Sequence, residues 1–130
     1  MKHLFVSYEL ALLAKEKGFN EPCLACFSDL HNAPNSILLT GNYPYFFYKN
    51  DMCSLSAPLY QQLVDWFRED HKIEVVVLSN THTCSKDVKW EWSLYSLTNK
   101  KIIKYPVLNV PSYYQAITAS LTEAFKLINP

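Results

Sequence analysis

The sequence predicts an α+β fold in a single domain, residues 1–130, with an antiparallel or mixed sheet and about three helices packed mainly on one face. Three observations predict this class. Segments with helical spacing of apolar residues follow Ser7, Ser56 and Ser112. Between residues 73 and 105, apolar residues recur with the period of a strand. A chain of 130 residues, 49% hydrophobic and 18% charged, is also long and apolar enough to bury a core.

The first helix is expected over residues 8–17, because Ser7 is a suitable N-cap and Gly18 a suitable C-terminal stop. Its buried stripe has spacings of three and four residues: Leu10, Leu13 and Ala14. The next apolar segment, residues 22–28, lies between a proline and a polar stretch, which is typical of a short buried strand. The Asn-, Asp- and Pro-rich residues 29–36 indicate a loop.

A short strand is expected over residues 37–40, followed by a turn at Gly41. A second helix is predicted to begin at Ser56, as N-cap, with Pro58 in its first turn, and to end near His71. Its apolar stripe consists of Leu59, Leu63, Trp66 and Phe67. The strand that starts at Ile73 carries apolar residues on both faces, which favours a central position in the sheet.

An antiparallel hairpin is expected next, because Trp90, Trp92 and Leu94 alternate with polar residues and a turn at residues 98–101 leads into residues 102–105. Pro106 and Pro111 are expected to break the chain before the last helix, which begins with a capping box of Ser112 and Gln115. The stripe that this helix is expected to bury comprises Tyr114, Ile117, Leu121, Ala124, Phe125 and Ile128.

Composition excludes several function classes. Lys plus Arg and Asp plus Glu both number 12, and zero net charge removes the attraction that drives non-specific binding to nucleic acids or anionic membranes. Two glycines are too few for the glycine-rich loops that cradle phosphates. No apolar segment has the length of a signal peptide core or a membrane span, so a cytoplasmic protein with reduced cysteines is expected, and no cofactor is predicted.

Two groups of residues suggest a metal site. Cys23 and Cys26, with Cys53 or Cys84, could hold zinc, but residues three apart on a strand point to opposite faces, which favours buried apolar thiols. The second group consists of Asp29, His31, His82 and Cys84. Its Asp-x-His pair is similar to a ligand motif of metallophosphoesterases, although the family's GDxxD motif is missing. A small metal-dependent enzyme or metal site is therefore an alternative function, and a polar loop is the simpler interpretation.

Lys100, Lys101 and Lys104 form a basic cluster on the hairpin beside Tyr105. Lysines on an edge strand suppress pairing with other chains, which is the simplest explanation of this cluster. The alternative is a nucleotide-binding or small-ligand module, in which aromatic rings line a pocket and these lysines contact phosphate.

Residues 43–48 concentrate rings within six positions: Tyr43, Tyr45, Phe46, Phe47 and Tyr48. One face of one strand cannot hold all of them, and exposed tyrosines are enriched at binding surfaces. The leading hypothesis is therefore a protein that acts by binding another protein through this segment. Core packing and a homodimer interface are the alternatives, and no catalytic residues are predicted.

Several segments together resemble an uncharacterised family of small proteins from Bacteroidetes phages and mobile elements. These segments are SYE (7–9) with AKEKGFNEP (14–22), APLYQQ (57–62) with WFR (66–68) and HKI (71–73), and YYQA (113–116) with AFKLI (124–128). The resemblance implies an accessory protein of a phage or mobile element in the cytosol of a bacterial host. It implies no activity and no site residues, and it does not extend to residues 29–53.

Overall fold

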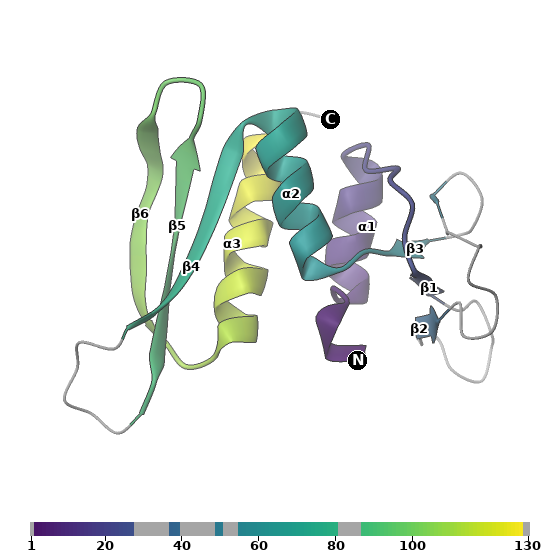
Figure 1. The fold of residues 1–130 in the computed structure, drawn as a ribbon, viewed down its shortest axis with the longest axis horizontal. Helices are drawn as coiled ribbons and strands as arrows, with labels where there is room; N and C mark the ends of the chain where they lie inside the picture. Colours follow the sequence, from purple (N-terminus) through teal and green to yellow (C-terminus); the bar gives the residue numbers. More distant parts are fainter. Residues whose placement is uncertain (1, 28–36, 40–48, 51–54, 81–86, 129–130) are drawn as a thin grey trace. The chain divides into compact units, whose positions relative to one another are not determined.

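The computed structural model describes residues 2–27, 37–39, 49–50, 55–80 and 87–128. In chain order, its elements are a 3-10 helix (Lys2–Leu4), α1 (Tyr8–Glu16), β1 (Ala25–Phe27), β2 (Ile37–Leu39), β3 (Ser56–Ala57), α2 (Tyr60–His71), β4 (Ile73–Asn80), β5 (Lys89–Ser96), β6 (Lys101–Val110) and α3 (Tyr113–Leu127) (Figure 1). Three α-helices and two antiparallel sheets in these residues confirm the predicted α+β class. The chain forms two compact units, Met1–Leu63 with Asn129–Pro130 (unit 1) and Val64–Ile128 (unit 2).

The sheet of unit 1 has the strand order β2-β1-β3, with β1 in the centre. Both neighbours are antiparallel, and Ala25 lies opposite Leu39 on one side and Ala57 on the other. All three residues of β1 are buried, as expected for a short apolar segment between a proline and a polar stretch of sequence. Tyr8 of α1 packs edge-to-face on Phe27, with 5.4 Å between ring centroids, so the helix and the sheet share one core.

Helix α1 confirms both predicted ends. The Ser7 side chain accepts a hydrogen bond from the Leu10 N–H at 3.3 Å. At the other end the Phe19 N–H donates to the Ala14 carbonyl (2.9 Å) and the Gly18 N–H to the Lys15 carbonyl (3.1 Å). This pair of bonds is a Schellman motif, which needs a left-handed residue at Gly18, where φ is +93°.

Replacing Gly18 by alanine is expected to lower the free energy of unfolding by about 1 kcal/mol, because an L-residue pays to adopt a left-handed backbone. A Cβ at this position meets no described atom within 4 Å, so backbone conformation alone causes the loss. The midpoint of urea unfolding measures it. Lys17→Ala, at the neighbouring C-cap with φ −90°, is the matched control. Equal stability of Gly18→Ala and the parent protein would contradict this assignment.

Ser56 does not begin the second helix, so that prediction was wrong. Ser56 lies in β3 opposite Cys26 of β1, and its backbone N–H donates to Asn50 Oδ1 at 2.9 Å. Helix α2 begins at Tyr60 instead. There Gln62 Oε1 accepts from the Leu59 N–H at 3.2 Å, and this bond caps the first turn in place of Ser56.

The sheet of unit 2 has the order β4-β5-β6, and both pairings are antiparallel. The hairpin of β5 and β6 is as predicted. The central position predicted for the strand at Ile73 is wrong, because that strand, β4, lies at one edge and β5 occupies the centre. The apolar residues on the second face of β4 were the basis of the prediction, yet Val76 is only half-buried and Leu78 is exposed.

Helix α3 packs against β4 and β5 and buries the inner face of this sheet. The buried residues of the sheet are Ile73, Val75, Trp92 and Leu94, and those of α3 are Ile117, Leu121, Ala124 and Phe125, with Ile128 at its C-cap. The predicted stripe of the last helix is therefore confirmed except at Tyr114, which is exposed. Ser112 caps the helix as predicted, since its Oγ accepts from the Gln115 N–H at 3.2 Å.

The prediction that Pro106 breaks the chain after the hairpin was wrong. Pro106 lies inside β6. A proline cannot donate a ladder hydrogen bond and is tolerated in edge strands or at bulges. Both conditions hold here, because β6 is an edge strand and its pairing with β5 shifts register between Trp92 and Leu94, which face Val107 and Lys104. Two residues of β6, Tyr105 and Pro106, thus lie opposite Ser93 alone.

Within the described residues, none of the helices combines the length and the apolar character that crossing a bilayer requires.

Candidate functional site

Many of the predicted site residues lie outside the residues that the structure describes. They are the aromatic segment Tyr43, Tyr45, Phe46, Phe47 and Tyr48, and the metal candidates Asp29, His31, His82 and Cys84, together with Cys53. The binding role of the first group and the metal alternative therefore stay predictions.

Cys23 and Cys26 are both buried, and no disulfide joins these two described thiols. The Cys23 Sγ donates to the Glu21 carbonyl at 3.4 Å, a local contact in the segment before β1. In the described part of the chain, no three His, Cys, Asp or Glu side chains gather as a metal site would require. The surroundings of these two cysteines are those of small apolar core residues.

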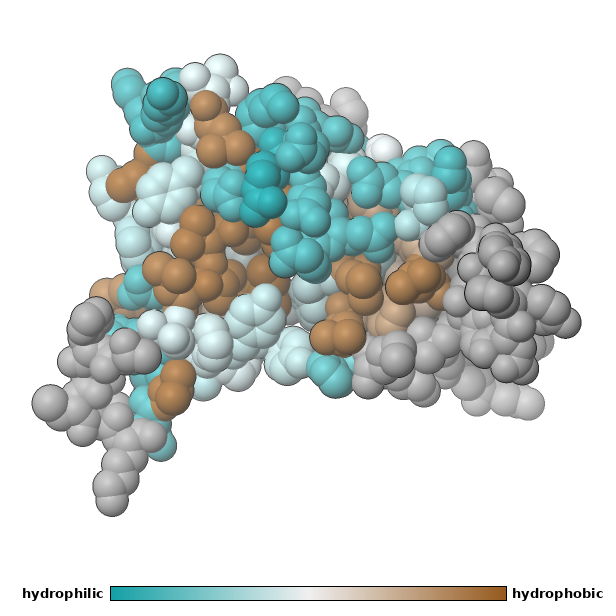
Figure 2. Space-filling view, viewed as in Figure 1, coloured by the Kyte–Doolittle hydropathy of each residue, from teal (hydrophilic) through white to brown (hydrophobic). Residues whose placement is uncertain are grey.

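The three predicted lysines are all described, and all three are exposed. Lys100 lies in the turn of the β5–β6 hairpin with a left-handed backbone (φ +55°), and Lys101 starts β6. Figure 2 shows hydrophilic residues over this hairpin end, at the top of the view. Lys104 lies on the α3 side of the sheet. There Lys126 Nζ donates to Glu123 Oε1 at 2.7 Å, and this bond lowers the pKa of Glu123. The charge of Lys104 lowers that pKa further.

The outer face of the unit 2 sheet carries several exposed apolar side chains. Val75 and Leu94 pair with each other and are buried on the α3 side of the sheet. Because side chains alternate along a strand, residues an odd number of positions from these two on β4 and β5 point away from α3. On β6, Ile102 pairs with Tyr95, and Tyr105 and Leu108 fall opposite Ser93 and Glu91. We call the apolar side chains of this surface the open face: Val76, Leu78, Tyr95, Ile102, Tyr105 and Leu108.

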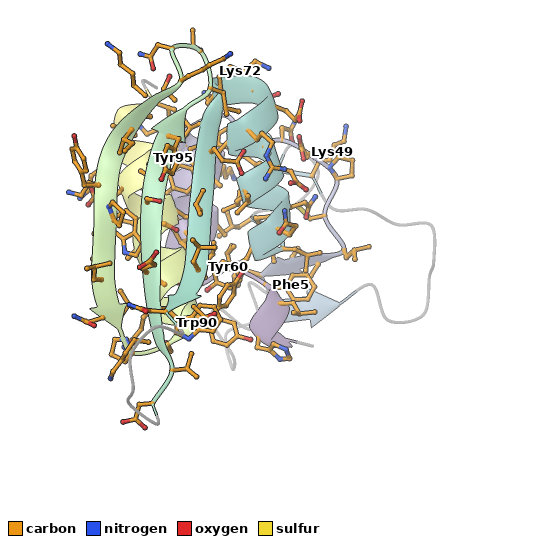
Figure 3. All side chains as sticks on the ribbon, turned by 60° about the vertical axis from the view of Figure 1, so that its left-hand side comes forward. Phe5, Lys49, Tyr60, Lys72, Trp90 and Tyr95 are labelled. Atoms are coloured by element: carbon orange, nitrogen blue, oxygen red, sulfur yellow. The ribbon has the colours of Figure 1, made fainter. Side chains whose placement is uncertain are left out.

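Solvent reaches most of the open face. Tyr105 is 76% exposed, Leu108 54%, Leu78 53% and Ile102 43%, whereas Val76 and Tyr95 are half-buried. Figure 3 looks onto this surface, with Tyr95 near its middle and α3 behind the sheet. Large apolar side chains gathered on one face mark interaction sites more often than scattered ones do.

The charges around the open face cancel. Glu74 lies at one end of β4, and Arg68 of α2 binds it through two hydrogen bonds, Nε to Oε2 at 2.7 Å and Nη2 to Oε1 at 2.8 Å. The hydrogen bond and the charge of Glu74 raise the pKa of Arg68 above its usual range. At the other end, Lys89 and Glu91 of β5 point to the same side, with opposite charges.

Sequence reasoning identified the hairpin lysines but missed the open face. A signal was present in β4, where Val76 and Leu78 make the second face apolar as well as the first. That pattern predicted two covered faces, whereas α3 covers one face and the other is exposed.

No family model, curated protein or solved structure matches the chain. The relation to small proteins of Bacteroidetes phages and mobile elements thus stays a prediction from the segments in which the sequence resembles them.

Proposed function

We propose that this protein is non-enzymatic and acts by binding a protein partner, and that the open face with strand β6 is a contact surface. The exposure of β6 carries the proposal. Seven of the ten residues of this strand (KIIKYPVLNV) are apolar or aromatic, yet none is buried. A strand of this composition is ordinarily covered on one face, so its exposure supports a partner that covers it.

The chemistry of the surface also favours a protein partner. Tyr95 and Tyr105 give large, rigid contact areas at low entropic cost, and aliphatic residues of β4 and β6 flank them. Residues 43–48 are proposed as a second contact segment on the composition of the sequence alone. The bacterial cytosol and a phage or mobile-element origin are proposed on the resemblance alone.

Photo-crosslinking tests the proposal. A photoreactive amino acid replaces Ile102 or Tyr105 in the full chain, and Leu127 of α3, 46% exposed, is the matched control position. Irradiation in the expressing cells is expected to attach a discrete protein species at positions 102 and 105 and not at 127. Equal labelling at all three positions, or none at any, contradicts a contact surface on β6.

A further inference from the structure

Resting on this proposed function, we infer that the partner of the open face is a second copy of the same chain, so that two sheets pack face to face in a symmetric dimer. Three features of the molecule support such a dimer: the way in which the edge of β6 is built, the charge of the open face, and the charge of the whole chain.

The edge of β6 is unsuited to strand-to-strand association. Its register against β5 shifts between Trp90 and Trp92, between Trp92 and Leu94, and again before Tyr95. Asn109 has a left-handed backbone (φ +60°) and Pro106 lacks an N–H. Bulges, proline and lysine are devices that prevent another strand from adding to an edge. A partner is thus directed to the face of the sheet and away from its rim.

The open face itself is apolar and balanced in charge, which decides what can cover it. Lys101 and Lys104 pair with Ser96 and Leu94, on the α3 side, and so lie outside the open face. Glu74 is neutralised by Arg68, and Lys89 is matched by Glu91. An acidic partner therefore finds no excess of positive charge there, whereas a surface that is equally apolar and neutral is complementary to it.

The chain supplies such a surface. Its formal net charge at pH 7 is zero, so two copies approach without repulsion. In a twofold dimer the same patch serves both partners, so a patch without an excess of either charge meets its copy without net repulsion. Two such sheets would pack about 10 Å apart and bury the exposed rings of both copies between them.

Sedimentation velocity of the purified full chain over a dilution series tests the inference. The parent protein is expected to dimerise, and Tyr105→Lys and Ile102→Lys, both on β6, each to weaken the dimer at least about tenfold by burying an unpaired charge. Leu127→Lys on α3 is the control and leaves the dimer unchanged. Circular dichroism establishes that each variant is folded, as expected for changes at exposed positions.

A parent protein that stays monomeric at every concentration overturns the inference, and so does equal weakening by Leu127→Lys. The two proposals fail separately. If the protein is monomeric but residues 102 and 105 crosslink to a different protein, only the dimer is wrong. If it is monomeric and those positions crosslink to nothing, the binding function is wrong as well.

Discussion

Replacing Phe67 by alanine is expected to lower the free energy of unfolding by about 3–5 kcal/mol, a large share of the stability of a small domain. Phe67 of α2 is fully buried. Its ring meets Phe125 of α3 edge-to-face, with 4.8 Å between centroids, and also contacts Trp66 at 5.2 Å. Truncation removes the transfer free energy of the ring, the aromatic contacts and the packing around the resulting cavity.

Tryptophan fluorescence during urea unfolding measures this loss directly. All three tryptophans, Trp66, Trp90 and Trp92, lie in unit 2 with Phe67. Phe67→Leu is expected to lose clearly less stability than Phe67→Ala, because it refills part of the cavity. Tyr105→Ala, on the exposed strand, is expected to change the free energy by less than about 0.5 kcal/mol in the monomer. A loss below about 1 kcal/mol for Phe67→Ala would contradict the packing described.

Asn50→Ala is expected to destabilise unit 1 by about 1–3 kcal/mol, because one side chain satisfies two backbone groups from distant segments. Asn50 Nδ2 donates to the Phe19 carbonyl at 2.7 Å, and Asn50 Oδ1 accepts from the Ser56 N–H at 2.9 Å. Ser56 is fully buried, so its N–H gains no water in exchange for the lost bond. The same bonds connect the end of α1 to strand β3.

Amide hydrogen exchange at Ser56 measures this effect at its source, and faster exchange is expected in Asn50→Ala. Asn50→Asp provides a sharper test. The carboxylate keeps an acceptor for Ser56 but places a second oxygen against the Phe19 carbonyl, so this nearly isosteric change should cost at least as much. Asn20→Ala, at an exposed position, is the control for the loss of an asparagine side chain. Unchanged exchange at Ser56 in both Asn50 variants would rule out this role.

The elements with local signals could be predicted from the sequence. The cap at Ser7, the stop at Gly18 and the strand with Trp90, Trp92 and Leu94 each depend on residues a few positions apart, and each is confirmed. The expected alternation of burial is interrupted at Ser93, which is buried like its two neighbours. Ser56 failed because its partners are distant in sequence. Its N–H bonds to Asn50 and its strand pairs with Cys26, and neither contact is visible in a sequence that otherwise resembles a helix start.

The candidate site could be predicted only in part, for a related reason. The hairpin turn placed Lys100 and Lys101 at an exposed position without any knowledge of the topology. Predicting the open face requires two further facts: which of the two faces of β4 is covered, and how β6 is aligned with β5. The register shifts decide on which side Tyr105 and Leu108 lie, and a period of two residues does not reveal them.

The consecutive order of the strands in unit 2 has a consequence for how the chain reaches its native state. β4, β5 and β6 are neighbours in sequence and in space, so Asn80 and Lys89 pair across only a short stretch of chain. In unit 1, Ala25 of β1 must find Ala57 of β3 across a much longer stretch of chain. Short loops cost less entropy to close, and sheets with local contacts fold faster. The β4–β5–β6 sheet is thus suited to form first, before β3 joins β1.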